Sequence, residues 1–171
     1  MAIVSDTNIL CSLAAADSLG LIQRILPDDP ICIAPAVERE LHAGLARGKA
    51  HIERVIYAIQ SSTIQTLTLS EAEQALALNL PLSLHEGERE SIALCKMRRY
   101  LLLCNDHQAV RYCQRSAIDV INLEAFLRLA WLAGVVTQDE VRTLIETMET
   151  VEHLRLSPAQ YSRIFAPRPP S

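Results

Sequence analysis

Residues 2–8 of the chain read AIVSDTN, and this stretch decides the prediction of the fold. Its apolar residues include two adjacent β-branched ones, Ile3 and Val4, which predict a short strand buried on both faces. Asp6 comes directly after that strand. In open α/β sheets, functional groups lie beyond the carboxyl ends of the strands. The stretch therefore indicates an α/β protein with a carboxylate at the functional edge of its sheet.

The rest of the chain alternates short apolar runs with helical segments. Further strands are predicted at residues 31–33, 64–69, 100–104 and 118–121, with helices between them. Strands separated by helices favour a parallel sheet with helices on both faces. We therefore predict the α/β class: a three-layer α/β/α sandwich with a mainly parallel central sheet and extra C-terminal helices.

Composition narrows the class of protein. The chain has 171 residues, which suits one domain, and its net charge of -4 argues against a protein that coats nucleic acid non-specifically. No apolar run reaches the ~18 residues of a membrane span, and the start lacks a signal peptide, so we expect a cytoplasmic protein away from membranes. The five cysteines form no CxxC pair, which indicates buried apolar side chains rather than a zinc site or a disulfide framework.

Four acidic residues are expected to converge at one edge of the sheet. Asp6 and Asp106 each follow a predicted strand. Glu88 lies in the first turn of the helix that precedes the second of these strands, on a stripe that faces inward. Glu40 lies beside core positions on the helix after residues 31–33. This placement follows from strand and helix periodicity alone.

Such a cluster suits hard divalent cations. Close carboxylates repel one another, and Mg²⁺ or Mn²⁺ removes that repulsion through oxygen ligands. A site of this kind is suited to hydrolysis of phosphodiester bonds. An alternative stays open at this point: Asp6 and Glu88 are helix-terminal acids stabilised by the helix dipole, and Asp106 is an N-cap.

Four stretches of the chain occur in the order typical of one family. They are IVSDTN (3–8), APAVEREL (34–41), GERESIAL (87–94) and LLLCND (101–106). Over residues 2–135 the chain resembles the PIN-domain nucleases, which include the VapC-like toxins. The resemblance implies a PIN-like nuclease domain at residues 1–135. It also implies a C-terminal helical extension at 136–171, packed on the same domain, as in a longer subgroup of the family.

The resemblance assigns roles to particular residues. Asp6, Glu40, Glu88 and Asp106 match the four acids that serve as catalytic and metal-binding residues in the family. Asn8 matches the polar residue that supports the first acid. The implied cofactor is Mg²⁺ or Mn²⁺.

The chain also departs from the family pattern. Cys104 stands where Thr or Ser is common, two residues before the last acid, and we expect weaker support of the metal site there. Glu86 or Glu90 replaces Glu88 if the helix is rotated relative to the expected phase.

The resemblance implies a metal-dependent ribonuclease, the toxin of a toxin–antitoxin system, with RNA as substrate, an antitoxin protein as partner and a homodimeric assembly. Arg89 and Arg111 are candidates to hold RNA phosphates, because arginine pairs with phosphate in bidentate fashion. Two alternatives remain. One is a non-catalytic PIN-like module that binds RNA or protein. The other is a phosphohydrolase with Asp6 as nucleophile, although Asn8 stands where that chemistry needs a second acid.

Overall fold

The computed structural model describes residues 1–167; residues 168–171 of the expected C-terminal extension lie outside the described part. The strands are β1 (Ile3–Ser5), β2 (Ile31–Ile33), β3 (Ile64–Thr66), β4 (Leu101–Leu103) and β5 (Val120–Ile121). The helices are α1 (Thr7–Ala15), α2 (Leu21–Ile25), α3 (Pro35–Ala46), the 3-10 helix η1 (Ala50–Ile52), α4 (Glu53–Gln60), α5 (Glu71–Asn79), α6 (Glu86–Arg98), α7 (His107–Arg115), α8 (Leu123–Leu132), α9 (Gln138–Val151) and α10 (Pro158–Ile164).

The five strands form one sheet in the order β3-β2-β1-β4-β5, and every pairing is parallel. Ile3 of β1 lies opposite Ile31 on one side and Leu101 on the other. The chain runs outward from β1 to β3 and then returns to β4 on the far side of β1. In such a sheet the crevice for ligands opens at the carboxyl ends of the strands where the order reverses, here β1 and β4.

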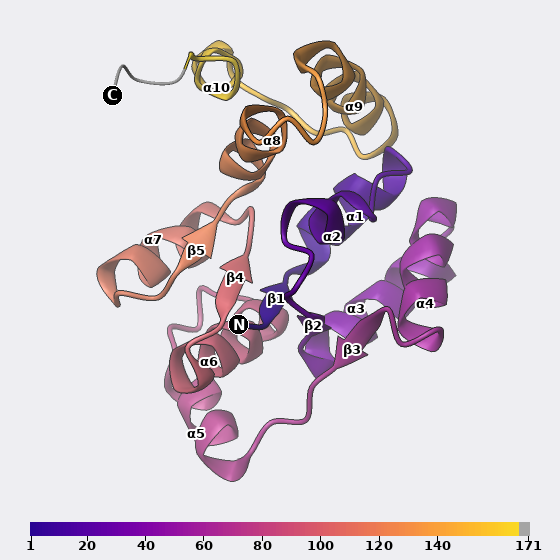
Figure 1. Cartoon of the computed structure of the whole chain (residues 1–171). Helices are drawn as coiled ribbons and strands as arrows, with labels where there is room; N and C mark the ends of the chain where they lie inside the picture. Colours follow the sequence, from indigo (N-terminus) through magenta and orange to yellow (C-terminus); the bar gives the residue numbers. More distant parts are fainter. Residues whose placement is uncertain (168–171) are drawn as a thin grey trace.

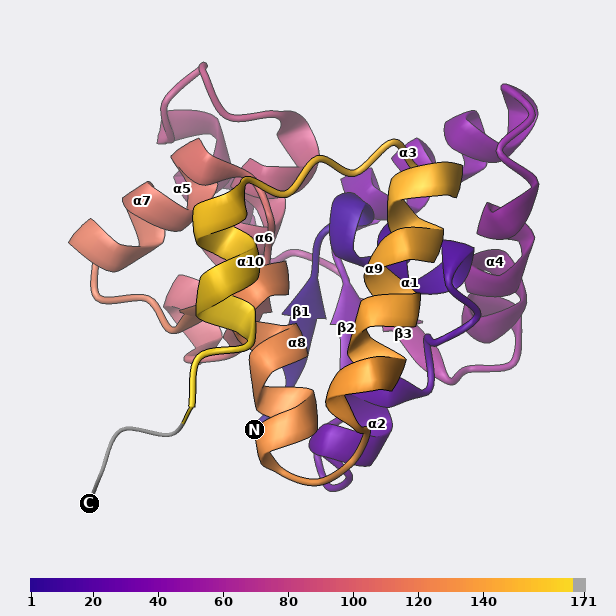
Figure 2. The ribbon, with the colours of Figure 1, turned by 90° about the horizontal axis from the view of Figure 1, so that it is seen from above.

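Helices cover both faces of the sheet, which confirms the α/β prediction. Figure 1 shows α1, α2 and α8 on one face and α6, with α5 outside it, on the other. α9 packs on α1 and α8, and α10 packs on α8. Seen from above, the segment between α9 and α10 passes across the end of the sheet toward which the strand arrows point (Figure 2). The connection between the two C-terminal helices therefore reaches the edge of the sheet where the strands end.

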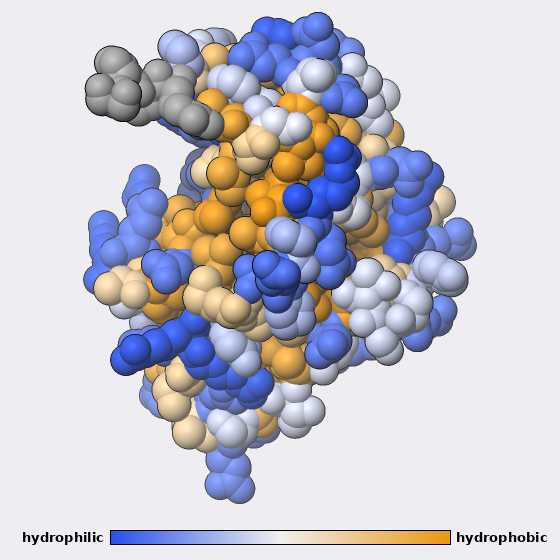
Figure 3. Space-filling model, viewed as in Figure 1, coloured by the Kyte–Doolittle hydropathy of each residue, from blue (hydrophilic) through white to orange (hydrophobic). Residues whose placement is uncertain are grey.

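The core explains why such short strands suffice. Every residue of β1, β2 and β4 is buried, as expected for central strands with helices on both faces. The space-filling view in Figure 3 shows apolar residues gathered in the middle of one face, around and below α8, with hydrophilic residues at the rim. Within residues 1–167, no helix combines the length and the apolar character needed to cross a membrane.

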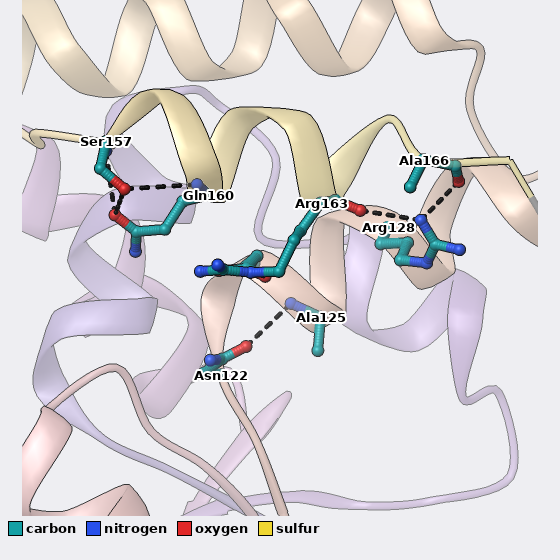
Figure 4. Close-up of polar contacts among 8 residues, drawn as sticks. Asn122, Ala125, Arg128, Ser157, Gln160, Arg163 and Ala166 are labelled. Atoms are coloured by element: carbon teal, nitrogen blue, oxygen red, sulfur yellow. Dashed lines mark hydrogen bonds and ion pairs between the residues drawn. The ribbon is translucent and has the colours of Figure 1, made fainter.

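The last helix is fastened to α8 by side chains that bind its backbone carbonyls. Arg128 of α8 donates to the carbonyl oxygens of Arg163, at 2.7 Å, and Ala166 (Figure 4). Trp131 Nε1 donates to Ile164 O at 2.8 Å. Carbonyls at the C-terminal end of a helix lack their full set of intrahelical partners, so α8 supplies hydrogen bonds to the end of α10.

Two strands are shorter than expected. β3 ends at Thr66 rather than at 69, where its pairing with β2 ends. β5 covers only Val120–Ile121 of the strand expected at 118–121. α7 begins at His107, because the Asp106 side chain caps the helix.

A buried ion pair joins α5 to α6. Glu73 accepts hydrogen bonds from Arg98 Nε at 2.6 Å and Nη2 at 2.8 Å, and its side chain is 4% exposed. Glu73 also closes a capping box with Ser70. The hydrogen bonds from Arg98 are the main reason that the pKa of Glu73 falls to about 2. The carboxylate therefore stays ionised well into acid.

We expect Glu73→Gln to lower the free energy of unfolding by about 1–3 kcal/mol at neutral pH, because Arg98 loses a charged acceptor in a buried position. A carboxyl group whose pKa is lowered by folding stabilises the folded state at pH values above its unfolded-state pKa. This stabilisation is lost as the pH falls toward the folded-state pKa. The difference from the natural protein should therefore shrink between pH 4.5 and about 2. Urea melts across this range measure it. Glu71→Gln, an exposed position two residues earlier, is the matched control, and an equal loss there contradicts the assignment.

Candidate active site

Asp6 is the fixed centre of the site. It caps α1, where Oδ1 accepts the N–H of Ile9 at 2.8 Å, and Oδ2 accepts the N–H of Asn105 at 2.9 Å. Asn105 lies just after β4, so one carboxylate joins the ends of the two central strands. The Asp6 residue is 4% exposed. Its position follows from the strand that precedes it and from the capping preference of Asp.

Glu40 reaches the same place from the middle of α3. Thr7, the residue after Asp6, donates its hydroxyl to Glu40 Oε2. The first turn of α6 lies against the other oxygen: a Cβ atom at Gly87 would come within 2.8 Å of Glu40 Oε1. Only glycine permits this approach without a shift of the carboxylate. Glu40 is thus held from two sides.

Glu88 enters from the first turn of α6. Its Oε2 accepts the N–H of His85 at 2.9 Å in a capping box, and its side chain lines the pocket that contains Asp6 and Glu40. Its neighbours on α6 point elsewhere: Glu86 and Glu90 both pair with Arg39, at 2.9 and 3.3 Å. The phase of α6 thus places Glu88, and neither of these two acids, beside Asp6.

Asp106 caps α7 at the edge of the group. Its Oδ1 accepts the N–H groups of Gln108, at 2.7 Å, and Ala109, at 2.9 Å. It is not among the residues that line the pocket. Its negative charge nevertheless acts on Asp6 and Glu88, whose pKa values it raises. Asp106 therefore lies at the edge of the group and acts on the other acids through its charge.

Burial, and to a smaller extent neighbouring charge, opposes ionisation of Asp6 and Glu88. The pKa of Asp6 is raised chiefly by burial and further by Asp106, although hydrogen bonds from Ile9, Asn105 and Cys104 oppose the rise. The pKa of Glu88 is raised by burial first, and by the charges of Asp106 and Asp6. A cation placed among these carboxylates would favour their ionised forms.

Cys104 supports Asp6 directly. Its thiol adjoins the Asp6 carboxylate and helps to keep the pKa of Asp6 from rising further, while burial, followed by the charge of Asp6, raises the pKa of the thiol. The thiol therefore stays protonated and can donate, as a Thr or Ser hydroxyl would. Cysteine is the weaker donor, but it fills the same position.

The acids open into a pocket of about 340 Å³. Arg47 and Lys49, which follow α3, line it together with Glu152 from the end of α9. Lys49 Nζ lies 3.2 Å from Glu152 Oε2, whereas Arg47 is exposed. The basic residues therefore lie within the same pocket as the acids. Sequence reasoning missed them, although the run RGK at 47–49 was a visible signal.

The remaining residues expected at the site lie at three different locations. Asn8 lines the pocket with an exposed side chain, while backbone N–H groups hold Asp6. Arg111 is exposed on α7, just beyond the cap formed by Asp106. Arg89 lines a separate hollow between α5 and α6. Thr7, which sequence reasoning missed, is the partner of Glu40 and directly follows the acid that was predicted.

Capping accounts for three of the four acids but not for their arrangement as a group. Asp6, Glu88 and Asp106 each accept backbone N–H groups at a helix start, as the structural alternative predicts. Glu40 lies in the middle of α3 and caps nothing there. Its side chain is held beside Asp6 by Thr7 from another helix. The arrangement of acids around one pocket is the feature that capping leaves unexplained.

A comparison with protein-family models matches residues 2–167 to a family described as a PIN domain. No curated protein matches the chain. PIN domains are generally nucleases, typically metal-dependent ones that bind Mg²⁺ or Mn²⁺. The five-stranded parallel sheet agrees with that family. Because the match covers nearly the whole chain, the protein belongs to the PIN-domain family.

Proposed function

We propose that the protein is a ribonuclease that hydrolyses RNA phosphodiester bonds with Mg²⁺ or Mn²⁺. Asp6, Glu40, Glu88 and Asp106 are its proposed catalytic and metal-binding residues. The observation that carries the proposal is the meeting of three of these acids in one pocket, with the charge of Asp106 acting on two of them.

The donor set fits a hard divalent cation. The acids offer carboxylate oxygens, the ligands that Mg²⁺ and Mn²⁺ prefer. Burial, and to a smaller extent the charge of Asp106, raises the pKa values of Asp6 and Glu88, and a bound cation would favour their ionised forms. When bound, the ion supplies an activated water and neutralises charge on the phosphoryl group.

The residues of the chain provide positioning. Two backbone N–H groups hold both oxygens of Asp6, and Thr7 orients Glu40. Each cap uses one oxygen, Oε2 of Glu88 and Oδ1 of Asp106, so the other oxygen of each side chain is available to a ligand. Rigid placement of this kind lowers the reorganisation that a reaction requires.

Substrate phosphates are assigned to the basic residues near the acids. Arg47 lines the pocket and Arg111 lies on α7 beyond Asp106. Arginine suits phosphate because its planar fork donates two parallel hydrogen bonds. The role as a toxin, the antitoxin partner and the homodimer stay predictions from the family resemblance.

Purified protein should cleave RNA with Mg²⁺ or Mn²⁺ and stop in EDTA. Asp6→Asn and Glu40→Gln should lower the rate by about 100-fold or more, since each removes a charged oxygen ligand. Cleavage of labelled RNA measures the rate, and thermal melts verify folding.

Glu38→Gln is the matched control, because Glu38 lies on α3 two residues from Glu40 but pairs with His42. Undiminished cleavage in EDTA contradicts the metal mechanism. RNA binding without cleavage in the natural protein points to the non-catalytic module.

Asp106→Asn should leave the metal-free protein as stable, or more stable by about 1 kcal/mol, because Asn keeps the helix cap while one repelling charge is lost. A carboxyl group whose pKa is raised by folding destabilises the folded state at pH values above its unfolded-state pKa. The gain should therefore vanish below about pH 4, where the carboxyl groups are protonated in both states. The same variant should show a smaller rise in melting temperature with Mn²⁺. Melts in EDTA and in excess Mn²⁺ test both effects. An unchanged Mn²⁺ shift places Asp106 outside the metal site.

Arg47→Ala should weaken RNA binding and reduce its dependence on salt concentration, because a phosphate contact is lost. Fluorescence anisotropy with labelled RNA at several salt concentrations measures both. Lys96→Ala is the control, since Lys96 is exposed on α6 about 12 Å along the helix from Glu88. Equal effects of the two substitutions remove the reason to place RNA at this pocket.

A further inference from the structure

A second group of possible metal ligands lies beside the acid pocket. It consists of Cys11 on α1, His51 in η1 and Glu152, the residue after α9. One ligand atom from each lies within 4.8 Å of the other two. The three come from distant parts of the chain, so no spacing in the sequence reveals the group.

One ring nitrogen of His51 contacts a carboxylate but makes no hydrogen bond. The side chain is 9% exposed, and Nε2 lies 2.6 Å from Glu152 Oε1. The contact lacks the alignment of a hydrogen bond, and Nε2 has no hydrogen-bond partner within residues 1–167. A buried polar atom in this state costs free energy. A bound ion shared by the nitrogen and the carboxylate removes that cost.

Cys11 supplies a sulfur atom to the same place. The residue is buried, and burial together with the charge of Glu152 raises the pKa of its thiol to about 12. The thiol is therefore protonated and unreactive as it stands. Coordination to a metal ion deprotonates a thiol outright, so metal binding would release a proton here.

We infer that Cys11, His51 and Glu152 form a binding site for a zinc-like transition-metal ion, distinct from the all-oxygen site proposed for Mg²⁺ or Mn²⁺. Sulfur, imidazole and carboxylate are the ligands that Zn²⁺ takes, whereas Mg²⁺ avoids sulfur. Three protein ligands leave the fourth tetrahedral position to water. The bound ion would need the short contact between His51 and Glu152 to open.

The surroundings give an ion access. A hollow of about 770 Å³ is lined by His51, Glu152 and Lys49. The Lys49 ammonium lies 3.2 and 3.3 Å from the two oxygens of Glu152 and would compete with a cation. The Lys49 side chain is 48% exposed, so it can move into solvent when an ion binds. Binding then exchanges the single charge of Lys49 for the two charges of the ion, and the proton released by Cys11 balances the difference.

An ion in this position would act on the C-terminal segment. Glu152 begins the connection from α9 to α10, and Cys11 and Glu152 also line the acid pocket. A bond to both would fasten the segment to α1 and η1 at the rim of that pocket. The inference concerns this rim, and it holds whether or not the acids cleave RNA.

Titration with Co²⁺ in the presence of excess Mg²⁺ tests the site, because cobalt occupies zinc sites and gives a charge-transfer absorption when bound to thiolate. The full-length protein should bind one Co²⁺ with that absorption, and Zn²⁺ should displace it. Cys11→Ser should abolish the absorption, while Cys113→Ser, at another buried cysteine, should retain it. His51→Gln and Glu152→Gln should each weaken Co²⁺ binding at least about 10-fold.

The Asp6→Asn variant separates this proposal from the proposed nuclease site, because it should retain the cobalt absorption. Zn²⁺ should also raise the melting temperature of the natural protein, but not that of His51→Gln. Absence of the absorption, or its persistence in Cys11→Ser, overturns the proposal. Either result leaves His51 and Glu152 as an ion pair only.

Discussion

The arrangement of this protein depends on the hydrogen bonds that the buried Asp6 carboxylate accepts. One oxygen receives the N–H of Ile9, in the first turn of α1, and the other receives the N–H of Asn105, which follows β4. Because β1 and β4 are neighbours where the strand order reverses, one side chain fixes the geometry of the functional edge. A carboxylate is tolerated in this buried position because its oxygens are satisfied by fixed backbone donors.

Capping and a proposed catalytic role are compatible in the same carboxylate. A helix cap occupies one oxygen and directs the side chain toward the start of the helix. When helix starts converge at one edge of a sheet, their capping acids converge as well, and Asp6, Glu88 and Asp106 illustrate this. Burial, and to a smaller extent the charge of Asp106, raises the pKa values of Asp6 and Glu88. Glu40 joins them from the middle of α3, where it caps no helix and is held by Thr7 instead.

Local patterns predicted much of the fold. The apolar runs predicted the central strands correctly. The end of β3 could not be predicted, because it depends on pairing with β2 rather than on its own residues. The N-cap role considered for Asp106 is present at the start of α7, where its side chain accepts two backbone N–H groups.

The site was less accessible to sequence reasoning, because its contacts join distant segments. Acidic residues after strands could be found from periodicity, but the hydrogen bond from Thr7 to Glu40 spans 33 positions along the chain. The role of Gly87 depends on how closely α6 approaches α3. Glu152 lies outside every family stretch recognised in the sequence, yet it lines the same pocket as Asp6. Long-range packing decides all three.

The position of Glu152 links the C-terminal helices to the electrostatics of the pocket. Glu152 is held where α9 ends, and α9 packs on α1, the helix that Asp6 caps. Beyond it, the chain passes over the edge of the sheet (Figure 2). It is secured again at the end of α10, which Arg128 binds (Figure 4) and to which Trp131 also donates a hydrogen bond. A segment fixed at both ends keeps its charge in place. The negative charge of Glu152 at the pocket therefore depends on apolar and hydrogen-bonded contacts far from the acids, and the Lys49 ammonium balances it locally.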